Sequence, residues 1–363
     1  MRDFFLTDDD RAFRAEVREF LDRELAPRAA AIENEDDWSA TCAAVRALGE
    51  AGYLRLMFRD LYRGSLANPG LTHATMLSEE AAAINYAFDT TIGTALSCAY
   101  PLHRYATPAV RERWLSLLLD GRGVGAIGVT EPGTGSDAAG MQTSIRFDAA
   151  TREWVIDGFK RYISNASVAD VYVIYGISKP GVPSHQGMSA VVVPKDARGI
   201  SFPRRYTFMG RRGCVVGEVK LEKCRVPAEN LLGDPEQGFR IMLSMFNFER
   251  TILGGSGLGV ARSAFDIATA HAQRRVAFGE RLGAKQLIWD MVAQMSAQID
   301  SAELLTYRAA KMYDAGVDAK ALMKPAAMAK LVATEAATFC ADRTVQILGG
   351  DGNTKAYGGA EQR

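Results

Sequence analysis

The chain has 363 residues, of which 48% are hydrophobic and 24% charged, a composition typical of a globular protein with a large core. Its 43 basic residues balance 43 acidic residues, so the charge does not favour nucleic acid as a partner. No apolar run approaches the roughly 18 residues of a membrane span, and the acidic start, residues 1–10, is unlike a signal peptide.

Neither the five cysteines nor the four histidines have the spacing of a metal site. Because no C-x-x-C pair occurs, we expect reduced thiols in a cytoplasmic protein. The cysteines are Cys42, Cys98, Cys214, Cys224 and Cys340, and the histidines are His73, His103, His185 and His271.

The first part of the chain, residues 1–122, has helical patterns. Thr7 precedes three aspartates, which predicts an N-cap with acidic residues in the first turn. One apolar face then continues at helical spacing until Pro27. Its residues are Phe13, Val17, Phe20, Leu21 and Leu25. Residues 76–87 and 110–119 have similar patterns and predict two more helices.

The middle part, residues 123–232, has short runs of β-branched and aromatic residues that predict strands. These runs are residues 124–129, 154–156, 171–175 and 189–193. The last part, 233–363, returns to helical segments rich in Ala, Met and Leu, which suit a helix bundle. The sequence thus predicts a mostly helical α+β protein with three domains, 1–122, 123–232 and 233–363.

The most informative segment is residues 130–137, TEPGTGSD, which directly follows the apolar run at 124–129. Two glycines allow close approach of a ligand to the backbone, and the hydroxyls and N–H groups can donate hydrogen bonds. By itself the segment is equally consistent with an ordinary polar turn. Its glycines lack the spacing of a dinucleotide-binding G-x-G-x-x-G loop.

A second segment, GFKRYISNA at residues 158–166, decides how the first should be interpreted. Together they resemble the flavin-binding signature of the acyl-CoA dehydrogenase family, a TEPGxGSD loop and a GxKxWITN strand. Further matches follow in the family's order at residues 225–233, 275–279, 286 and 346–350. The resemblance covers the chain except its C-terminal end. It implies an FAD flavoprotein with an N-terminal helical domain, a central β-barrel-like domain and a C-terminal four-helix bundle.

The resemblance also implies where the flavin binds. Val129 and Thr130 would meet the ring through backbone and hydroxyl, and Tyr162 and Ser164 would lie beside it. Ser136 would lie near the cofactor phosphates or the thioester arm of the substrate. The family usually has tryptophan where this chain has Tyr162, which alters access to the flavin edge and the choice of electron acceptor. Without the resemblance, a strand tyrosine is more commonly a core residue.

Four further FAD contacts are implied across a subunit interface, which would make the protein a homodimer or homotetramer. Arg275 would reach the pyrophosphate of FAD in a neighbouring subunit, where a planar cation pairs well with phosphate. Phe278, Gln346 and Gly350 match other residues at that interface. Taken alone, Arg275 is more typical of a solvated charge at a helix end.

The implied reaction removes an α-proton and a β-hydride from an acyl thioester, so a carboxylate base is required. Most relatives carry it in a C-terminal Y-E-G-T loop, which this chain does not reach before Arg363; residues 357–363 resemble the loop only slightly, with Gly358 in place of the glutamate. Isovaleryl- and long-chain-type enzymes carry it on a bundle helix, and Glu249 stands at that position. Asn247 and Arg250 would contact the substrate. Glu131 is the second candidate, although the family uses it structurally.

The predicted function is therefore FAD-dependent α,β-dehydrogenation of an acyl-CoA or a carrier-protein-bound acyl group. An electron-transfer flavoprotein or a similar protein would accept the electrons. Two alternatives stay open at this point. One is a flavin monooxygenase or oxidase of the same fold, and the other is a catalytically inert FAD-binding homologue.

Overall fold

A computed structural model describes residues 6–33 and 38–354. The chain divides into two compact units. The first contains the described parts of Met1–Arg23, Gly70–Tyr86 and Arg250–Arg363, and the second contains those of Glu24–Pro69 and Ala87–Glu249.

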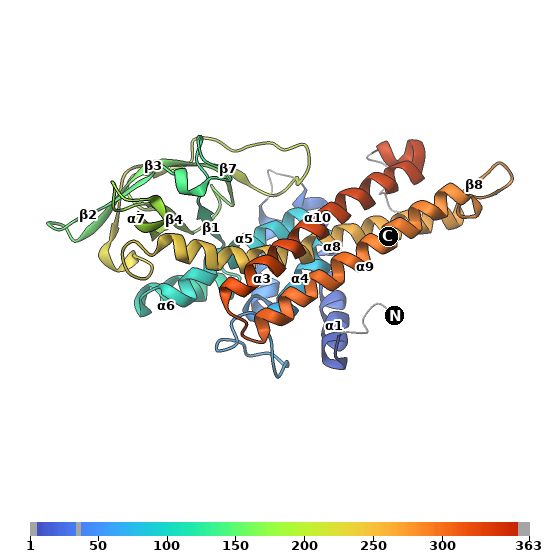
Figure 1. Ribbon diagram of the computed structural model, residues 1–363, viewed down its shortest axis with the longest axis horizontal. Helices are drawn as coiled ribbons and strands as arrows, with labels where there is room; N and C mark the ends of the chain where they lie inside the picture. Colours follow the sequence, from blue (N-terminus) through green and yellow to red (C-terminus); the bar gives the residue numbers. More distant parts are fainter. Residues whose placement is uncertain (1–5, 34–37, 355–363) are drawn as a thin grey trace. The chain divides into compact units, whose positions relative to one another are not determined.

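The second unit is built around a sheet (Figure 1). Its strands are β1 (Gly125–Gly128), β2 (Ser144–Asp148), β3 (Glu153–Ser164), β4 (Val171–Ile177), β5 (Met188–Pro194), β6 (Ile200–Ser201) and β7 (Val216–Pro227). Their spatial order is β1-β4-β2-β3-β7-β6, and β5 pairs with β4. The long antiparallel pair β3–β7 has a register shift between Lys160 and Ile163, which is a β-bulge.

Three longer helices accompany this sheet in the second unit: α3 (Ser39–Glu50), α5 (Tyr86–Tyr105) and α6 (Pro108–Leu119). Shorter turns are α2 (Ala29–Ile32) and α7 (Ser184–Gly187). Helix α5 packs closely on β1, because a Cβ on Gly125 would lie 2.6 Å from the Cβ of Cys98. Only glycine therefore fits at this contact between helix and sheet.

The first unit is helical. It contains most of α1 (Asp8–Glu24), α4 (Leu71–Ile84), the C-terminal part of α8 (Gly238–Arg274), α9 (Gln286–Asp314) and α10 (Ala319–Leu348). Helices α9 and α10 run side by side (Figure 1). The hairpin of β8 (Val276–Ala277) and β9 (Glu280–Arg281) joins α8 to α9.

Local signals in the sequence explain these helix ends. The Thr7 hydroxyl accepts a 3.1 Å hydrogen bond from the Asp10 N–H, and the Asp10 carboxylate accepts a 2.9 Å bond from the Thr7 N–H. This reciprocal cap confirms the predicted start of α1. Asp318 caps α10 in the same way, accepting bonds from the N–H groups of Lys320 and Ala321.

The predicted strands and helices are present, but two differ in extent: β3 continues to Ser164, well beyond the expected 154–156, and α4 differs from the expected 76–87 at both ends. Helix α4 begins at Leu71, earlier than the expected residue 76, and ends at Ile84. Its polar residues Thr72, Thr75, Ser78 and Glu79 are buried together with its apolar ones. The first turns therefore have no amphipathic pattern that the sequence could reveal.

Charged residues hold the first unit together internally. Arg262 pairs with both Glu79 and Glu303, and Arg14 donates a 2.8 Å hydrogen bond to the Tyr307 hydroxyl. Burial raises the pKa of the Tyr307 phenol well above its usual range. These groups stay paired because unpaired charges in a protein interior are very costly.

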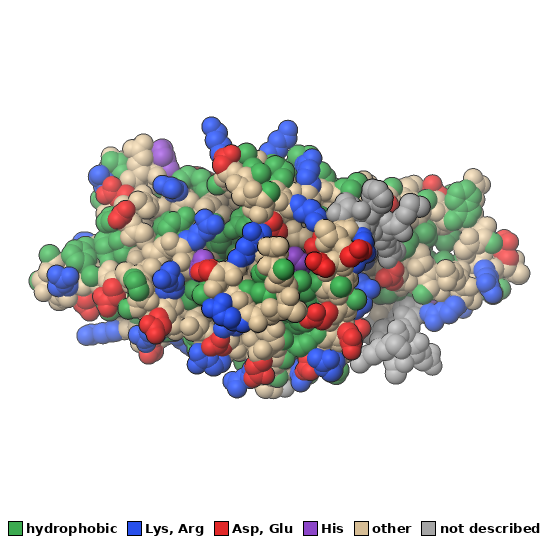
Figure 2. Space-filling model, turned by 90° about the horizontal axis from the view of Figure 1, so that it is seen from below, with side chains coloured by type: hydrophobic (Ala, Val, Ile, Leu, Met, Phe, Trp, Pro, Cys, Tyr) green, Lys and Arg blue, Asp and Glu red, His purple; other side chains and the backbone are tan. Residues whose placement is uncertain are grey.

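On the face shown in Figure 2, basic and acidic side chains are interspersed rather than segregated by sign. Within the described ranges, none of the helices is both long enough and apolar enough to cross a bilayer.

Candidate flavin and acyl-thioester site

The TEPGTGSD segment forms a tight loop after β1. The Glu131 N–H donates to the Thr134 carbonyl over 2.9 Å, and the Thr134 N–H donates back to Glu131 over 3.1 Å. The Glu131 carboxylate accepts bonds of 2.6 Å and 3.0 Å from the N–H groups of Gln142 and Thr143. The loop is thus closed on itself around one buried carboxylate.

A buried ion pair fixes this loop to β3. The Lys160 ammonium lies 2.8 Å from Glu131 Oε1 and 3.1 Å from the Val129 carbonyl, and Lys160 is 0% exposed. Burial lowers the pKa of Lys160 to about 8. Burial alone would raise the pKa of Glu131, but Lys160 and the hydrogen bonds hold it below its usual range. Val129 and Glu131, which flank Thr130, are therefore held rigidly.

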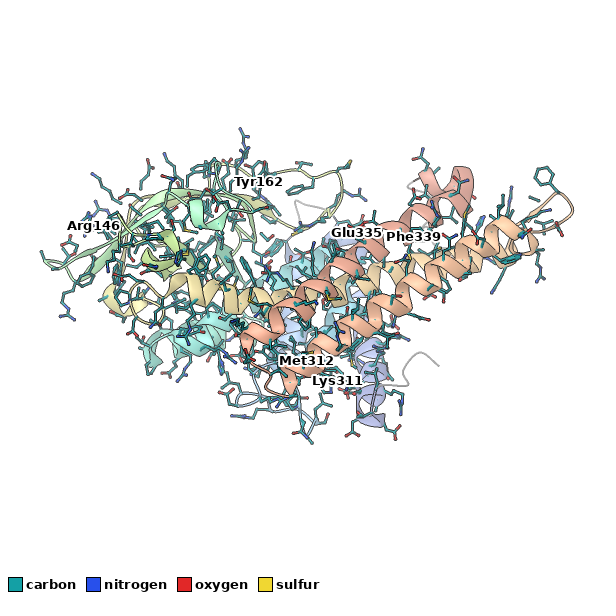
Figure 3. All side chains as sticks on the ribbon, in the orientation of Figure 1. Arg146, Tyr162, Lys311, Met312, Glu335 and Phe339 are labelled. Carbon is teal, nitrogen blue, oxygen red and sulfur yellow. The ribbon has the colours of Figure 1, made fainter. Side chains whose placement is uncertain are left out.

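Tyr162 lies at the bulge of β3, with a left-handed backbone at φ 55°. Its ring is 52% exposed, so it is not the core aromatic that a strand tyrosine usually is. Figure 3 shows the ring at the end of the sheet beside the loop that joins β6 to β7. Ser164, two residues on, is half-buried.

Asn165 holds the end of β3. It is buried, also has a left-handed backbone, and donates from Nδ2 to the carbonyls of Thr91 and Gly125 over 3.1 Å and 3.0 Å. Its N–H donates to the Val215 carbonyl. Asn165 therefore connects the end of β3 to α5, β1 and the segment before β7.

These residues fit a flavin. A planar ring needs a flat wall and fixed donors, and Tyr162 offers a half-exposed ring near the loop that contains Thr130. A Cβ added at Gly133 or Gly135 would meet nothing within 4 Å, so space beside the loop is open. Ser136, in the same loop, is exposed and free to meet a ligand.

The proposed base, Glu249, is half-buried on α8 and is the last residue of the second unit. The preceding Phe248 stacks on Tyr100 of α5, with ring centroids 5.5 Å apart. Tyr175 of β4 is fully buried, and its pKa is raised by burial and, to a smaller extent, by the charge of Glu249. Asn247 is buried on the same helix. Glu249 therefore follows a buried aromatic residue of α8, and its charge acts on the buried Tyr175.

The remaining predicted residues, Arg275, Phe278, Gln346 and Gly350, all belong to the first unit, as does Arg250. Arg275 follows α8 and is exposed. Phe278 lies in the β8–β9 hairpin with φ 55° and is 97% exposed. Gln346 and Gly350 lie at the end of α10 and are exposed. An exposed cation and an exposed aromatic ring thus lie within four residues of each other in the link from α8 to α9.

The structure thus places Val129, Thr130, Ser136, Tyr162 and Ser164 in one unit with Asn247 and Glu249. The sequence analysis missed Lys160 and Asn165 as the residues that hold the loop. The lysine of the GxKxWITN strand pattern was the available signal for the first. Within 6–33 and 38–354, no group of three or more His, Cys, Asp or Glu residues could hold a metal ion.

Comparison with known proteins agrees with this geometry. Sequence models of the acyl-CoA dehydrogenase N-terminal, middle and C-terminal domains match residues 7–122, 126–224 and 236–362. The chain is 32% identical over 360 residues to the probable acyl-CoA dehydrogenase YngJ of Bacillus subtilis, covering 98% of this chain and 91% of the relative. It is 32% identical over 338 residues to the human mitochondrial short-chain specific acyl-CoA dehydrogenase, covering 92% and 79%.

Among solved structures, butyryl-CoA dehydrogenase from Megasphaera elsdenii superposes with a TM-score of 0.90 at 29% identity, covering 98% of this chain and 91% of that one. These findings confirm the predicted fold, the flavoprotein oxidoreductase class and FAD as the cofactor. They do not favour an oxygen-using or an inert homologue. The chain belongs to the acyl-CoA dehydrogenase family.

Proposed function

We propose that this chain removes the α-proton and the β-hydride from an acyl-CoA thioester, with Glu249 as the base. The observation that carries the proposal is the rigid loop around Thr130, held beside the half-exposed Tyr162 in the same unit as Glu249. Relatives named for butyryl-CoA, glutaryl-CoA and short-chain substrates favour coenzyme A over a carrier protein as the acyl carrier.

When bound, FAD supplies the acceptor for the hydride. The chain's own residues bind and orient the cofactor: Val129, Thr130 and Ser164 hold the edge of the flavin ring, and Tyr162 lies beside the ring as an aromatic wall. Ser136 meets the cofactor phosphates or the thioester arm. Asn247 and Arg250 hold the acyl carrier.

Glu249 takes the α-proton at its carboxylate. Its neighbours on α8, α5 and β4 include the stacked pair of Phe248 and Tyr100 and the buried Tyr175. When the acyl chain displaces water, this aromatic surrounding disfavours the charged carboxylate and raises its pKa. The carboxylate thereby becomes basic enough to accept a proton from carbon.

The test is Glu249→Gln, with Glu229→Gln as the control because Glu229 is an exposed glutamate of the same unit. In anaerobic stopped-flow mixing with acyl-CoA thioesters, Glu249→Gln should retain its FAD and reduce it about 10²–10⁴ times more slowly than the parent. Parent-rate reduction by Glu249→Gln would assign the base to another carboxylate. A parent enzyme whose flavin no acyl thioester bleaches would overturn the dehydrogenase proposal itself.

The electron acceptor and the acyl carrier are part of the same proposal. An electron-transfer flavoprotein or a similar redox protein accepts the electrons. The same bleaching experiment with acyl groups on a carrier protein tests the alternative carrier: faster reduction by those substrates would replace coenzyme A in the proposal. The domain limits 1–122, 123–232 and 233–363 and the cytoplasmic location stay predictions.

We also propose that the protein is a homodimer or homotetramer in which Arg275, Phe278, Gln346 and Gly350 contact FAD of a second copy. Large apolar side chains on α9 and α10 are exposed, which supports a covered face. They include Leu287, Leu304 and Leu331.

Sedimentation and FAD titration test this assembly together. Arg275→Ala should weaken FAD binding by about one to two orders of magnitude, because it removes a charge-assisted pair worth roughly 1.5–3 kcal/mol. Arg308→Ala, which removes an exposed arginine from α9, should leave binding unchanged. A monomer that holds FAD as tightly as the assembly would refute the shared site.

A further inference from the structure

Tyr162 occupies a costly position. A left-handed backbone is rare for a large aromatic residue and costs on the order of 1–3 kcal/mol. The conformation also leaves half of its ring in solvent, while Lys160 and Ile163 on either side are buried. Such strain persists only where surrounding contacts enforce it.

Arg161 and Tyr206 supply those contacts. The guanidinium carbon of Arg161 lies 4.9 Å from the centre of the Tyr162 ring and 5.8 Å from that of Tyr206. The two tyrosine rings are themselves 4.9 Å apart, between centroids, and tilted by 35°. Tyr162 is therefore supported along one side by a cation and a second aromatic ring.

Hydrogen bonds fix that support in turn. Arg161 Nε donates to the Tyr206 hydroxyl over 2.8 Å, and this hydroxyl donates to Glu218 Oε1 over 2.5 Å. Arg161 Nε also lies 3.9 Å from the Glu218 carboxylate. The bond that Arg161 donates to the Tyr206 hydroxyl raises the pKa of the guanidinium above its usual value, so Arg161 is charged at any working pH.

Backbone hydrogen bonds attach this network to β7 and to the loop that contains Thr130. Glu218 lies on β7, and its N–H donates to the Arg204 carbonyl, while the Tyr206 N–H donates to the Val216 carbonyl. The Arg161 N–H donates to the Thr130 carbonyl over 2.9 Å. Arg161 thus contacts the loop at residues 130–137 through its backbone N–H and the Tyr162 ring through its side chain.

We propose that Arg161, Tyr206 and Glu218 are positioning residues that hold Tyr162 as the wall of the flavin site. This inference rests on the proposed function. It has an electrostatic consequence as well: a fixed cation stacked on the ring that borders the flavin stabilises the negative charge that the flavin gains on reduction. Arg161 therefore raises the reduction potential of bound FAD.

Two variants separate the geometric role from the electrostatic one. Tyr206→Phe keeps the ring and all charges but loses both hydrogen bonds, and FAD should bind about threefold more weakly with little change in potential. Arg161→Gln loses stacking and charge, so FAD should bind about tenfold more weakly and its midpoint potential should fall. Arg161→Lys should keep the potential while FAD affinity falls.

The matched control is Arg146→Gln. Arg146 is an exposed arginine on β2 of the same sheet, and Figure 3 shows it at the opposite end from Tyr162. It should change neither FAD affinity nor potential. Circular dichroism melting of each apo-variant checks that the fold is retained.

If Arg161→Gln and Tyr206→Phe bind FAD as the parent does, the network holds nothing that the flavin uses, and the inference is wrong. If Arg161→Gln has the potential of the parent, the electrostatic part is wrong. Failure of the proposed function has a different signature, because the parent protein itself would then bind no FAD or would not be reduced by acyl thioesters.

Discussion

Replacing Lys160 by methionine tests whether the buried ion pair builds the flavin site. Lys160 is completely buried, and its ammonium donates to Glu131 and to the Val129 carbonyl. Methionine fills a similar volume but cannot donate. Lys160→Met would leave the Glu131 carboxylate buried with only the donors from Gln142 and Thr143.

The expected cost is about 3–5 kcal/mol of unfolding free energy, because removing one partner of a buried pair leaves an uncompensated charge. FAD should bind more weakly as well, since Lys160 fixes both residues that flank Thr130. Urea denaturation of the apo-protein measures the first effect, and fluorescence titration with FAD measures the second.

A double-mutant cycle sharpens the test. Lys160→Met combined with Glu131→Gln removes both charges, so the double variant should be more stable than Lys160→Met alone. The interaction energy from the cycle should be well over the roughly 0.5 kcal/mol by which independent sites depart from additivity. The reasoning would be refuted if Lys160→Met cost less than about 1 kcal/mol, the usual scale of an exposed pair, or if the cycle showed no coupling.

Three further predictions concern other buried groups. Burial raises the pKa of the Cys98 thiol from 9.0 to about 12, so the unfolded chain loses this proton first and the free energy of unfolding falls as pH rises from about 9 to about 12. In Cys98→Ala, urea denaturation across this pH range should show a free energy of unfolding that falls less steeply, by about 1.4 kcal/mol per pH unit. An unchanged pH dependence would contradict the raised pKa of Cys98. Arg262→Met should cost about 3–5 kcal/mol in thermal and urea unfolding because it leaves the buried carboxylates of Glu79 and Glu303 to share the Arg14 guanidinium, 3.4 Å and 3.8 Å away, whereas a loss below about 1 kcal/mol would mean that the cluster is solvated. Asn165→Gly keeps the left-handed backbone at no strain but loses two side-chain hydrogen bonds, so it should destabilise the protein less than Asn165→Ala, and the reverse order would show that the backbone conformation is unimportant.

Regular elements could be predicted where burial is one-sided or continuous. Residues 171–175 are an apolar run and residues 190–193 form another after Ser189; they lie in the buried strands β4 and β5, which pair with each other. The start of α4 could not be predicted, since its polar residues are buried in a helix surrounded on all sides. Periodicity reveals an element only when one of its faces differs from the other.

The candidate site also has parts that could be predicted from the sequence and parts that could not. The loop at 130–137 and the strand at 158–166 were recognisable because each is a continuous motif. The partnership of Glu131 with Lys160 could not be predicted from pattern, since a charged residue in a strand normally faces solvent. Nor could the network of Arg161, Tyr206 and Glu218, which joins β3 to the loop before β7 and to β7 itself. Hydrogen bonds between distant segments leave no periodic trace in the sequence.

The arrangement around Tyr162 explains why a departure from the family pattern is tolerated at this residue. Lys160 and Asn165, before and after it, are both fully buried and both held by hydrogen bonds to other segments. The chain between them has to bulge, and the left-handed residue at the bulge presents its side chain to solvent whatever its identity. The flanking residues therefore fix where the backbone of residue 162 leaves the sheet. In the proposed flavin site, Arg161 and Tyr206 then hold the side chain at 162, and the size of that side chain sets access to the flavin edge.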